Sequence, residues 1–222
     1  TFSSLPRVLL ELRHVLPPGD VARLGTLADE LHFVDGRVSN PANLTKQNLQ
    51  ADAADPKYAE SVQIVSAALS RSREFAEFAM PKRVAPPLLC RYEPGMKYGA
   101  HADAALIQFG NFRIRSDLSC TVFIGDPATY EGGELVIAVG NQTIAFKGEP
   151  GEAIVYPSTT LHAVAPVSPG RRHVPRPFIE SLIADQHQRT QVYVGSGDYT
   201  HIHLEGFLPT QSLKLAVFNK AQ

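Results

Sequence analysis

The clearest local signal in this chain is the stretch Val136-Ile137-Ala138-Val139-Gly140-Asn141-Gln142-Thr143-Ile144-Ala145-Phe146. Two runs of apolar and β-branched residues flank the dipeptide Gly140-Asn141. Glycine and asparagine tolerate the positive φ angles of a tight turn, and β-branched residues in short runs on both sides of such a turn are typical of paired strands. The stretch therefore predicts a β-hairpin.

The hairpin is one of many short apolar runs that follow Pro87. Turn signals separate these runs: Gly95, Asp126-Pro127, Gly132-Gly133, Gly148, Pro150-Gly151 and Pro169-Gly170. Many short strands at this spacing predict a sandwich or a barrel, and cupin-like jelly rolls build their sites between two sheets. The run 171–181 contains Pro175 and Pro177. Because proline cannot donate a hydrogen bond to a sheet, we expect this strand to lie at an edge or to be broken.

The first third of the chain predicts helices instead. Apolar residues recur at helical spacing after Pro17-Pro18-Gly19-Asp20, and residues 57–79 form a second helical candidate. Residues 36–55, which lie between them, are rich in Asn, Gln and Asp and show no period, so they predict a loop. Functional loops of this length are often lids. A permanently ordered surface loop packed on the helices would have the same composition.

Length and composition indicate a single domain that spans residues 1–222. With 44% hydrophobic content, a chain of 222 residues can bury a sizeable core without disulfides. The domain would comprise N-terminal helices and the lid-like loop in residues 1–85, a β core in residues 86–185, and a separate C-terminal segment in residues 186–222.

Charge and apolar patterning exclude several kinds of function. The chain has 21 basic and 22 acidic residues and a formal net charge of -1, so it lacks the basic footprint of a nucleic-acid-binding protein. It has no apolar run long enough to span a membrane, and its N-terminus lacks the pattern of a secretory signal. Cys90 and Cys120 lie in apolar runs, as small buried residues in a reducing compartment do. We therefore expect a cytoplasmic monomer or homodimer.

A motif for metal chemistry lies within the β region. In His101-Ala102-Asp103, the first and third residues would project to the same face of an extended strand. His162 would complete a set of two imidazoles and one carboxylate. On an octahedral ion this set leaves three positions open, which is the arrangement of non-haem Fe(II) oxygenases. A closed structural zinc site would leave none.

Further motifs surround this triad in a defined order. They are Asp35-Gly36-Arg37, Gln47-Asn48-Leu49-Gln50, Arg91-Tyr92-Glu93-Pro94-Gly95-Met96-Lys97-Tyr98-Gly99-Ala100, Asp117-Leu118-Ser119-Cys120-Thr121-Val122-Phe123, Glu131-Gly132-Gly133-Glu134-Leu135, Tyr156-Pro157-Ser158 and Leu161-His162. The order resembles the Fe(II)- and 2-oxoglutarate-dependent dioxygenases and, more narrowly, the bacterial PKHD-type hydroxylases, which are relatives of prolyl 4-hydroxylases. The resemblance runs from about residue 12 to about residue 185. It implies a double-stranded β-helix, a jelly-roll and cupin-like fold that is mainly β with N-terminal helices.

The resemblance also implies the cofactors. Fe(II) would be bound by His101, Asp103 and His162, with 2-oxoglutarate as cosubstrate and O2 as oxidant, and with succinate and CO2 as products. A C–H bond of the prime substrate, either peptidyl proline or a small molecule, would be hydroxylated. The resemblance leaves ascorbate open as a further cofactor. Lys46, Gln47 and Asn48 would face the substrate from the predicted lid.

An arginine is expected at the far end of the cosubstrate. A guanidinium matches a carboxylate with two hydrogen bonds. Arg172 stands at the G-x-R position that follows Gly170, and in the resembled family this position binds the distal carboxylate of 2-oxoglutarate. Tyr92 and Tyr98 would lie near the same cosubstrate. Arg171 and Arg176 compete with Arg172 for the role, and we expect both to be solvated surface residues.

Two other classes of function fit the same residues. A cupin-like metalloenzyme, either an isomerase or a zinc hydrolase, would use the triad without 2-oxoglutarate. A jelly-roll binding module with a vestigial site would need no chemistry. A second His-x-His pair, His201 and His203, could also bind a metal, but no carboxylate stands at the required spacing.

Overall fold

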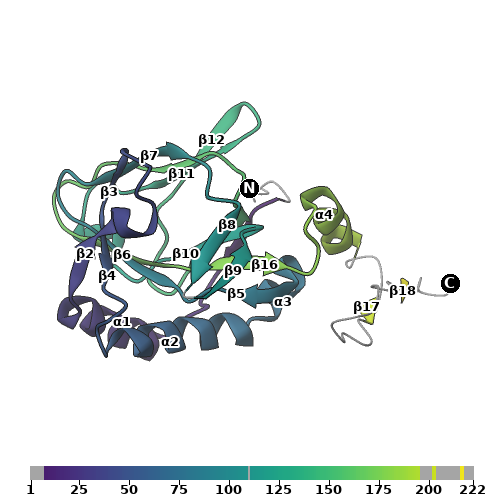
Figure 1. The fold of residues 1–222 in the computed structure, drawn as a ribbon, viewed down its shortest axis with the longest axis horizontal. Helices are drawn as coiled ribbons and strands as arrows, with labels where there is room; N and C mark the ends of the chain where they lie inside the picture. The colour runs from purple at the N-terminus through teal and green to yellow at the C-terminus, as the bar shows by residue number, and fades with distance from the viewer. Residues whose placement is uncertain (1–7, 110, 196–201, 204–215, 218–222) are drawn as a thin grey trace.

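The computed structural model describes residues 8–109, 111–195, 202–203 and 216–217, and the following statements concern these residues. They form a mainly β structure with helices along one side (Figure 1). The helices are α1 (Pro18–Glu30), α2 (Tyr58–Arg71), α3 (Arg73–Ala79) and α4 (Gln186–Gly195), and two short 3-10 helices are η1 (Gly36–Ser39) and η2 (Pro127–Thr129). The expectation of a mainly β fold with N-terminal helices is confirmed.

Two five-stranded sheets form the centre of the molecule. The strand order in the first is β1 (Leu10–Leu12), β13 (Ala153–Pro157), β10 (Leu118–Val122), β16 (Phe178–Ser181) and β5 (Pro81–Val84). The order in the second is β12 (Gln142–Phe146), β11 (Leu135–Val139), β14 (His162–Val164), β7 (Lys97–His101) and β3 (Lys46–Gln47). Strands of the second sheet lie at the top of Figure 1, above those of the first sheet.

Smaller strand groups complete the structure. A four-stranded sheet has the order β15 (Arg172–Arg176), β6 (Leu88–Tyr92), β4 (Leu49–Ala51) and β2 (Phe33–Asp35). Two further pairs are β8 (Leu106–Phe109) with β9 (Phe112–Arg115), and β17 (Ile202–His203) with β18 (Ala216–Val217). The predicted hairpin is present as β11 and β12, and Gly140 adopts a φ of 61° in its turn.

Two hydrophobic cores lie on opposite faces of the first sheet. Strand β13 shows the division, because successive side chains of a strand point to opposite faces. Val155 packs in the core that is shared with α1, α2 and α3, whereas Ile154 and Tyr156 pack in the core between the sheets. Both faces are covered, so all five residues of β13 are buried. Polar residues on the inner face of these strands are therefore shielded from water.

The N-terminal helices differ from the prediction at one point. The helix expected over residues 57–79 is two helices, because α2 ends at Arg71 and α3 begins at Arg73. Ser72 has an extended backbone, and its hydroxyl accepts a hydrogen bond of 3.2 Å from the backbone N–H of Phe75. A serine in this conformation caps the start of a helix. None of the helices in the described residues is long and apolar enough to cross a membrane.

The loop predicted over residues 36–55 is only partly a loop. Strand β3 pairs with β7 of the second sheet, and β4 pairs with both β6 and β2. The loop prediction is therefore wrong for residues 46–51. The apolar alternation that marks most strands is missing here because the inward side chains of these strands are polar. Lys46, Asn48 and Gln50 are buried. Gln47 is exposed, so the prediction that it faces the interior together with Lys46 and Asn48 is wrong.

The prediction for the proline-rich run 171–181 is confirmed. The run is broken at Pro177 into β15 and β16, and β15 forms the edge of its sheet. Pro175 lies on this edge strand, opposite Leu89 of β6. Residues 172, 174 and 176 of an extended strand share one face, and this arrangement positions two arginines for the site described next.

Candidate metal centre

The two histidines of the predicted triad face each other across adjacent strands. His101 ends β7, His162 begins β14, and the two residues are direct partners in the antiparallel ladder. Their ring centroids are 4.3 Å apart. Both side chains are buried, so the pairing holds two imidazoles together inside the molecule.

Asp103 completes the triad from a position beyond the end of β7. Its Oδ1 lies 3.6 Å from Nε2 of His101, and its Oδ2 lies 3.5 Å from Nε2 of His162. One ligand atom from each of the three residues lies within 4.8 Å of the others. Asp103 is not part of the strand, contrary to the i and i+2 argument, because its backbone N–H donates instead to the carbonyl of Ser158 at 2.9 Å.

The hydrogen bonds of the histidines prepare them to bind a metal. Nδ1 of His101 lies 2.8 Å from the carbonyl of Gly99, and Nδ1 of His162 lies 2.9 Å from the carbonyl of Thr160. An Nδ1–H that donates to a carbonyl leaves the lone pair on Nε2. Both Nε2 atoms are buried and have no hydrogen-bond partner. Burial also lowers the pKa of His162 to about 4, which favours the neutral form that metals require.

A cluster of serines supports the carboxylate of the triad. The hydroxyl of Ser119 on β10 donates to Oδ2 of Asp103 at 2.6 Å. Ser158 lies 2.8 Å from Ser119 and 2.7 Å from Ser116, so the three hydroxyls form a continuous buried chain. Sequence analysis did not assign Ser119 to the site. Metal-binding carboxylates are commonly oriented by such outer partners.

Replacing Ser119 by alanine is expected to weaken metal binding by roughly tenfold to a hundredfold, the range typical for loss of an outer partner. The reason is that Ser119 alone of the three serines donates to Asp103 in the described contacts. Ser116→Ala is the matched control, because Ser116 contacts Ser158 and not Asp103. Titration of both variants with Mn(II) by calorimetry measures the effect, and equal affinities in the two variants would contradict the role of Ser119.

Arg176 also reaches the triad, which corrects the expectation that it is solvated. Its Nη2 donates to Oδ1 of Asp103 at 3.3 Å, and both side chains are only 7% exposed. Burial acts to raise the pKa of Asp103, but the charge of Arg176, the nearby imidazole of His101 and the hydrogen bond from Ser119 lower it, so the net pKa lies below its ordinary value. The carboxylate is therefore ionised and able to bind a cation.

Arg172 lies deeper in the same interior. It faces Tyr92 in the register of β15 and β6, and its Cζ lies 5.2 Å from the centroid of the Tyr92 ring. Arg172 is 1% exposed, yet its Nε, Nη1 and Nη2 have no hydrogen-bond partner. A buried charge without a partner is strongly destabilising, so this guanidinium is suited to an anionic ligand.

Further polar atoms without a hydrogen-bond partner lie in the interior that holds the triad and Arg172. The hydroxyls of Tyr92, Tyr156 and Thr121 are buried and have no hydrogen-bond partner, like the guanidinium of Arg172 and the Nε2 atoms of the triad. Thr121 shares the inner face of β10 with Ser119, and Tyr156 packs against His162 with ring centroids 4.9 Å apart. These strands therefore surround a polar interior that a bound molecule with several acceptor groups would satisfy.

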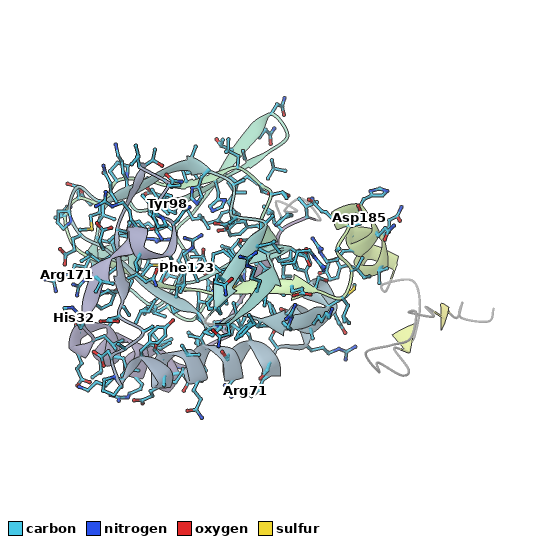
Figure 2. All side chains as sticks on the ribbon, viewed as in Figure 1. His32, Arg71, Tyr98, Phe123, Arg171 and Asp185 are labelled. Atoms are coloured by element: carbon cyan, nitrogen blue, oxygen red, sulfur yellow. The ribbon has the colours of Figure 1, made fainter. Side chains whose placement is uncertain are left out.

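The other predicted residues take distinct positions. Tyr98 stacks on His101 with ring centroids 3.6 Å apart, and its hydroxyl accepts a hydrogen bond of 3.2 Å from Asn40. Arg171 is solvated as expected, since its side chain is 61% exposed and lies at the outer edge of the molecule, away from Tyr98 (Figure 2). His201 lies outside the described residues, as does the side chain of His203.

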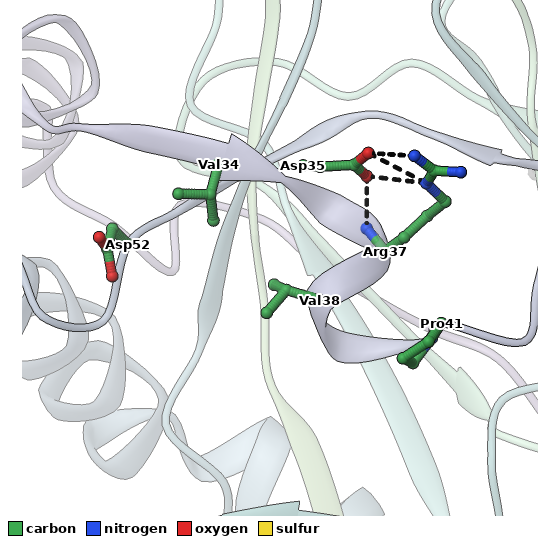
Figure 3. Close-up of a pocket in the computed structure, with 6 residues that line it drawn as sticks. All are labelled: Val34, Asp35, Arg37, Val38, Pro41 and Asp52. Carbon is green, nitrogen blue, oxygen red and sulfur yellow. Dashed lines mark hydrogen bonds and ion pairs between the residues drawn. The ribbon is translucent and has the colours of Figure 1, made fainter.

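A separate hollow of about 500 Å³ lies beside β2 and η1 (Figure 3). It is lined by Val34, Asp35, Arg37, Val38, Pro41 and Asp52, and none of these residues belongs to the triad. Asp35 and Arg37 point toward each other and form an ion pair (Figure 3). None of the residues that line this hollow has a buried side-chain atom without a hydrogen-bond partner, in contrast to the interior near Arg172.

Known proteins share both the sequence and the fold of this chain. Residues 87–179 match the 2OG-Fe(II) oxygenase superfamily. The chain is 47% identical over 186 residues to a PKHD-type hydroxylase of Sphingopyxis alaskensis, a match that covers 83% of this chain and 84% of the relative. It is 37% identical over 193 residues to a PKHD-type hydroxylase of Cupriavidus metallidurans, with 84% of each chain covered.

The fold is similar to that of a prolyl hydroxylase from Trichoplax adhaerens, solved in complex with a hypoxia inducible factor oxygen degradation domain peptide fragment. The TM-score is 0.60 at 11% identity, and the match covers 84% of this chain and 87% of that one. The two packed sheets are therefore the double-stranded β-helix of the 2-oxoglutarate oxygenases. Neither a cupin-like isomerase or zinc hydrolase nor a non-catalytic binding module is favoured by these relatives. The chain belongs to the PKHD-type hydroxylases of the 2OG-Fe(II) oxygenase superfamily, and it is a hydroxylase that depends on Fe(II) and 2-oxoglutarate.

Proposed function

We propose that His101, Asp103 and His162 hold the Fe(II) of this hydroxylase. The support is the donor set itself: two imidazoles with unpaired Nε2 atoms and one ionised carboxylate, all buried on one side of a polar interior. Three protein ligands leave positions free for a cosubstrate and for O2. The hydrogen bonds at Nδ1 of each histidine and at Asp103 keep the ligand atoms in place before the metal arrives.

Arg172 and Tyr92 bind the distal carboxylate of 2-oxoglutarate in this proposal. The observation that carries it is the fully buried guanidinium of Arg172, all of whose nitrogens are without a partner. A carboxylate can accept two parallel hydrogen bonds from such a group, and the Tyr92 hydroxyl can donate a further one. Gly133 makes room for Arg172, because a Cβ at Gly133 would lie 2.9 Å from Cδ of the arginine.

The tyrosine and threonine hydroxyls along the interior hold the cosubstrate in one orientation, and the apolar side chains around them exclude bulk water. With iron and 2-oxoglutarate bound, the site would use O2 as the oxidant: one oxygen atom enters succinate as 2-oxoglutarate loses CO2, and the other becomes the hydroxyl group on the substrate carbon. The chain itself performs no acid–base step. Tyr98, stacked on His101, fixes the plane of that imidazole.

The prime substrate is a small molecule or a peptide. Peptidyl proline is one candidate, since the Trichoplax relative is a prolyl hydroxylase solved with a peptide. We propose ascorbate as the reductant that keeps the iron in the Fe(II) state, and a cytoplasmic monomer or homodimer as the working form. Residues 36–45 are the longest part of the predicted lid that is not built into a sheet, and their closure over substrate stays a prediction.

Succinate release tests the proposed function. The protein incubated with Fe(II), ascorbate and 2-oxoglutarate is expected to form succinate slowly even without a prime substrate. The same protein loaded with Zn(II) is expected to form none, because zinc has no redox chemistry. Absence of succinate, together with absence of 2-oxoglutarate binding to the Mn(II)-loaded protein in calorimetry, would contradict the proposal.

A further inference from the structure

The interior near the triad has more positive charge than its own residues neutralise. The buried Lys, Arg and Glu residues among the described residues are Lys46, Arg172, Arg176, Glu180 and Arg189. Glu180 pairs with Arg83 and lies near Lys82, and Arg189 donates to the carbonyl of Ile183 at 2.8 Å. Three cations therefore remain near the triad, where the ionised carboxylate is that of Asp103.

Arg176 uses little of its hydrogen-bonding capacity. Its described hydrogen bond joins Nη2 to Asp103 at a long 3.3 Å, although a guanidinium offers five N–H donors. Its Cζ lies 5.7 Å from the centroid of the Phe178 ring and 6.0 Å from that of Tyr98, so aromatic faces hold the group without satisfying its donors. The nitrogens of Arg176 are not among the buried unpaired atoms, so its free donors face accessible space.

Lys46 adds a second cation beside the same tyrosine. Strand β3 places Lys46 opposite Tyr98 in the ladder, and Nζ lies 5.7 Å from the centroid of the tyrosine ring. Nζ donates to the hydroxyl of Ser39 at 2.6 Å, which leaves two of its three donors unused in the described contacts. Lys46 is 4% exposed, and burial lowers its pKa, so a positive charge on Lys46 inside the molecule favours an anionic partner.

Loading the enzyme does not remove this excess. The two charges of Fe(II) and the two of 2-oxoglutarate cancel, and Asp103 offsets only one of the three buried cations. Once Asp103 binds a metal, its charge is also shared with that ion. Buried charges without partners are costly, so a further anion is expected in the loaded site.

We propose that Arg176 binds a carboxylate of the prime substrate beside the iron, with Lys46 supplying a second positive charge to the same pocket. The proposal rests on the proposed function, because it takes the triad as the iron site and Arg172 as the partner of 2-oxoglutarate. It names the substrate class: a small molecule or a peptide terminus that carries a free carboxylate. A proline in the middle of a neutral peptide offers no such group.

A matched pair of small probes tests the proposal. The protein is loaded with Mn(II) and saturating 2-oxoglutarate, so that Arg172 is occupied, and the paramagnetic relaxation of the methyl protons of acetate and of acetamide is measured by NMR. Acetate is expected to show saturable relaxation well above that of acetamide, which has the same shape without the charge. Equal relaxation of the two probes would overturn the proposal.

Variants locate the acetate. Arg176→Met is expected to raise the acetate dissociation constant about tenfold or more, which corresponds to about 1.4 kcal/mol per tenfold. Lys46→Met is expected to raise it by a smaller factor. Arg171→Met is the matched control, because it removes the same charge from an exposed side chain. An Arg176→Met variant that binds acetate as tightly as Arg171→Met does would contradict the assignment.

Two further readouts keep the outcomes distinct. Calorimetry of 2-oxoglutarate binding on the same Mn(II)-loaded protein separates the two proposals. If the unaltered protein does not bind 2-oxoglutarate, the proposed function is overturned. If it binds 2-oxoglutarate but does not prefer acetate to acetamide, only the proposed carboxylate site is overturned. If Arg176 served only to orient Asp103, Arg176→Met would weaken Mn(II) binding while the unaltered protein treated acetate and acetamide alike.

Discussion

Removing any ligand of the triad is expected to abolish turnover and to lower the affinity for iron by more than about a hundredfold, because even outer partners of metal ligands contribute tenfold to a hundredfold. The variants are His101→Ala, Asp103→Ala and His162→Ala. Metal analysis and calorimetric titration with Mn(II) measure the loss. His173→Ala is the matched control: His173 is a partly buried histidine whose pKa burial lowers to about 4, but it is not part of the triad. Full iron occupancy in two of the three triad variants would disprove the assignment.

The three variants are expected to differ in stability. His101→Ala and His162→Ala remove imidazoles from the edge of a polar interior and should leave the fold largely intact. Asp103→Ala removes the carboxylate that faces Arg176 and leaves a buried cation without its ion-pair partner. Breaking a buried pair in this way costs roughly 3–5 kcal/mol. Thermal unfolding of the metal-free variants should therefore show the lowest midpoint for Asp103→Ala.

The second large effect is expected at the other end of the cosubstrate. Arg172→Ala should raise the apparent KM for 2-oxoglutarate by about two orders of magnitude or more, because losing one partner of a buried charge pair costs roughly 3–5 kcal/mol and each 1.4 kcal/mol is about tenfold. Steady-state succinate formation over a range of 2-oxoglutarate concentrations measures this change. Iron affinity in the absence of 2-oxoglutarate should stay close to that of the unaltered protein.

Two other arginine variants test whether the effect on the KM for 2-oxoglutarate belongs to Arg172 alone. Arg171→Ala is expected to change the KM for 2-oxoglutarate little, since its side chain is 61% exposed and its nearest acidic partner, Glu93, is 3.8 Å away. Arg176→Ala removes a side chain beside Asp103, and it should raise the KM for the prime substrate more than the KM for 2-oxoglutarate. A larger rise in the KM for 2-oxoglutarate from Arg176→Ala than from Arg172→Ala would reverse the two roles.

Short-range patterns in the chain predict much of the fold and indicate the candidate metal ligands. The β11–β12 hairpin follows from two runs of strand-forming residues around Gly140-Asn141, and α1 follows from apolar residues at helical spacing after Pro17. The His-x-Asp motif, the later His162 and the arginine ten residues beyond it were predicted because their order and spacing resemble those of the 2-oxoglutarate dioxygenases. Such patterns depend on the local geometry of the backbone, so a sequence displays them directly.

Local patterns did not predict the contacts of Ser119 and Arg176 or the strands in residues 46–51. Strand β10 contained a usable signal, because Leu118, Cys120 and Val122 pack toward the helices while Ser119 and Thr121 alternate with them and must face the opposite side. Strand alternation likewise puts Arg176 on the same face as Arg172. What this alternation does not reveal is which groups meet on that inner face.

Local sequence thus determined the hairpin, the first helix and the candidate metal ligands, whereas the contacts that complete the site were decided by the tertiary structure. Ser119 reaches Asp103 across 16 residues of sequence, and Arg176 reaches it across 73. Those contacts depend on strand register and on how the two sheets close over each other. The physical reason is that burial turns ordinary polar residues into a site: in water these side chains would be solvated, but between two packed sheets each must find a partner or a ligand.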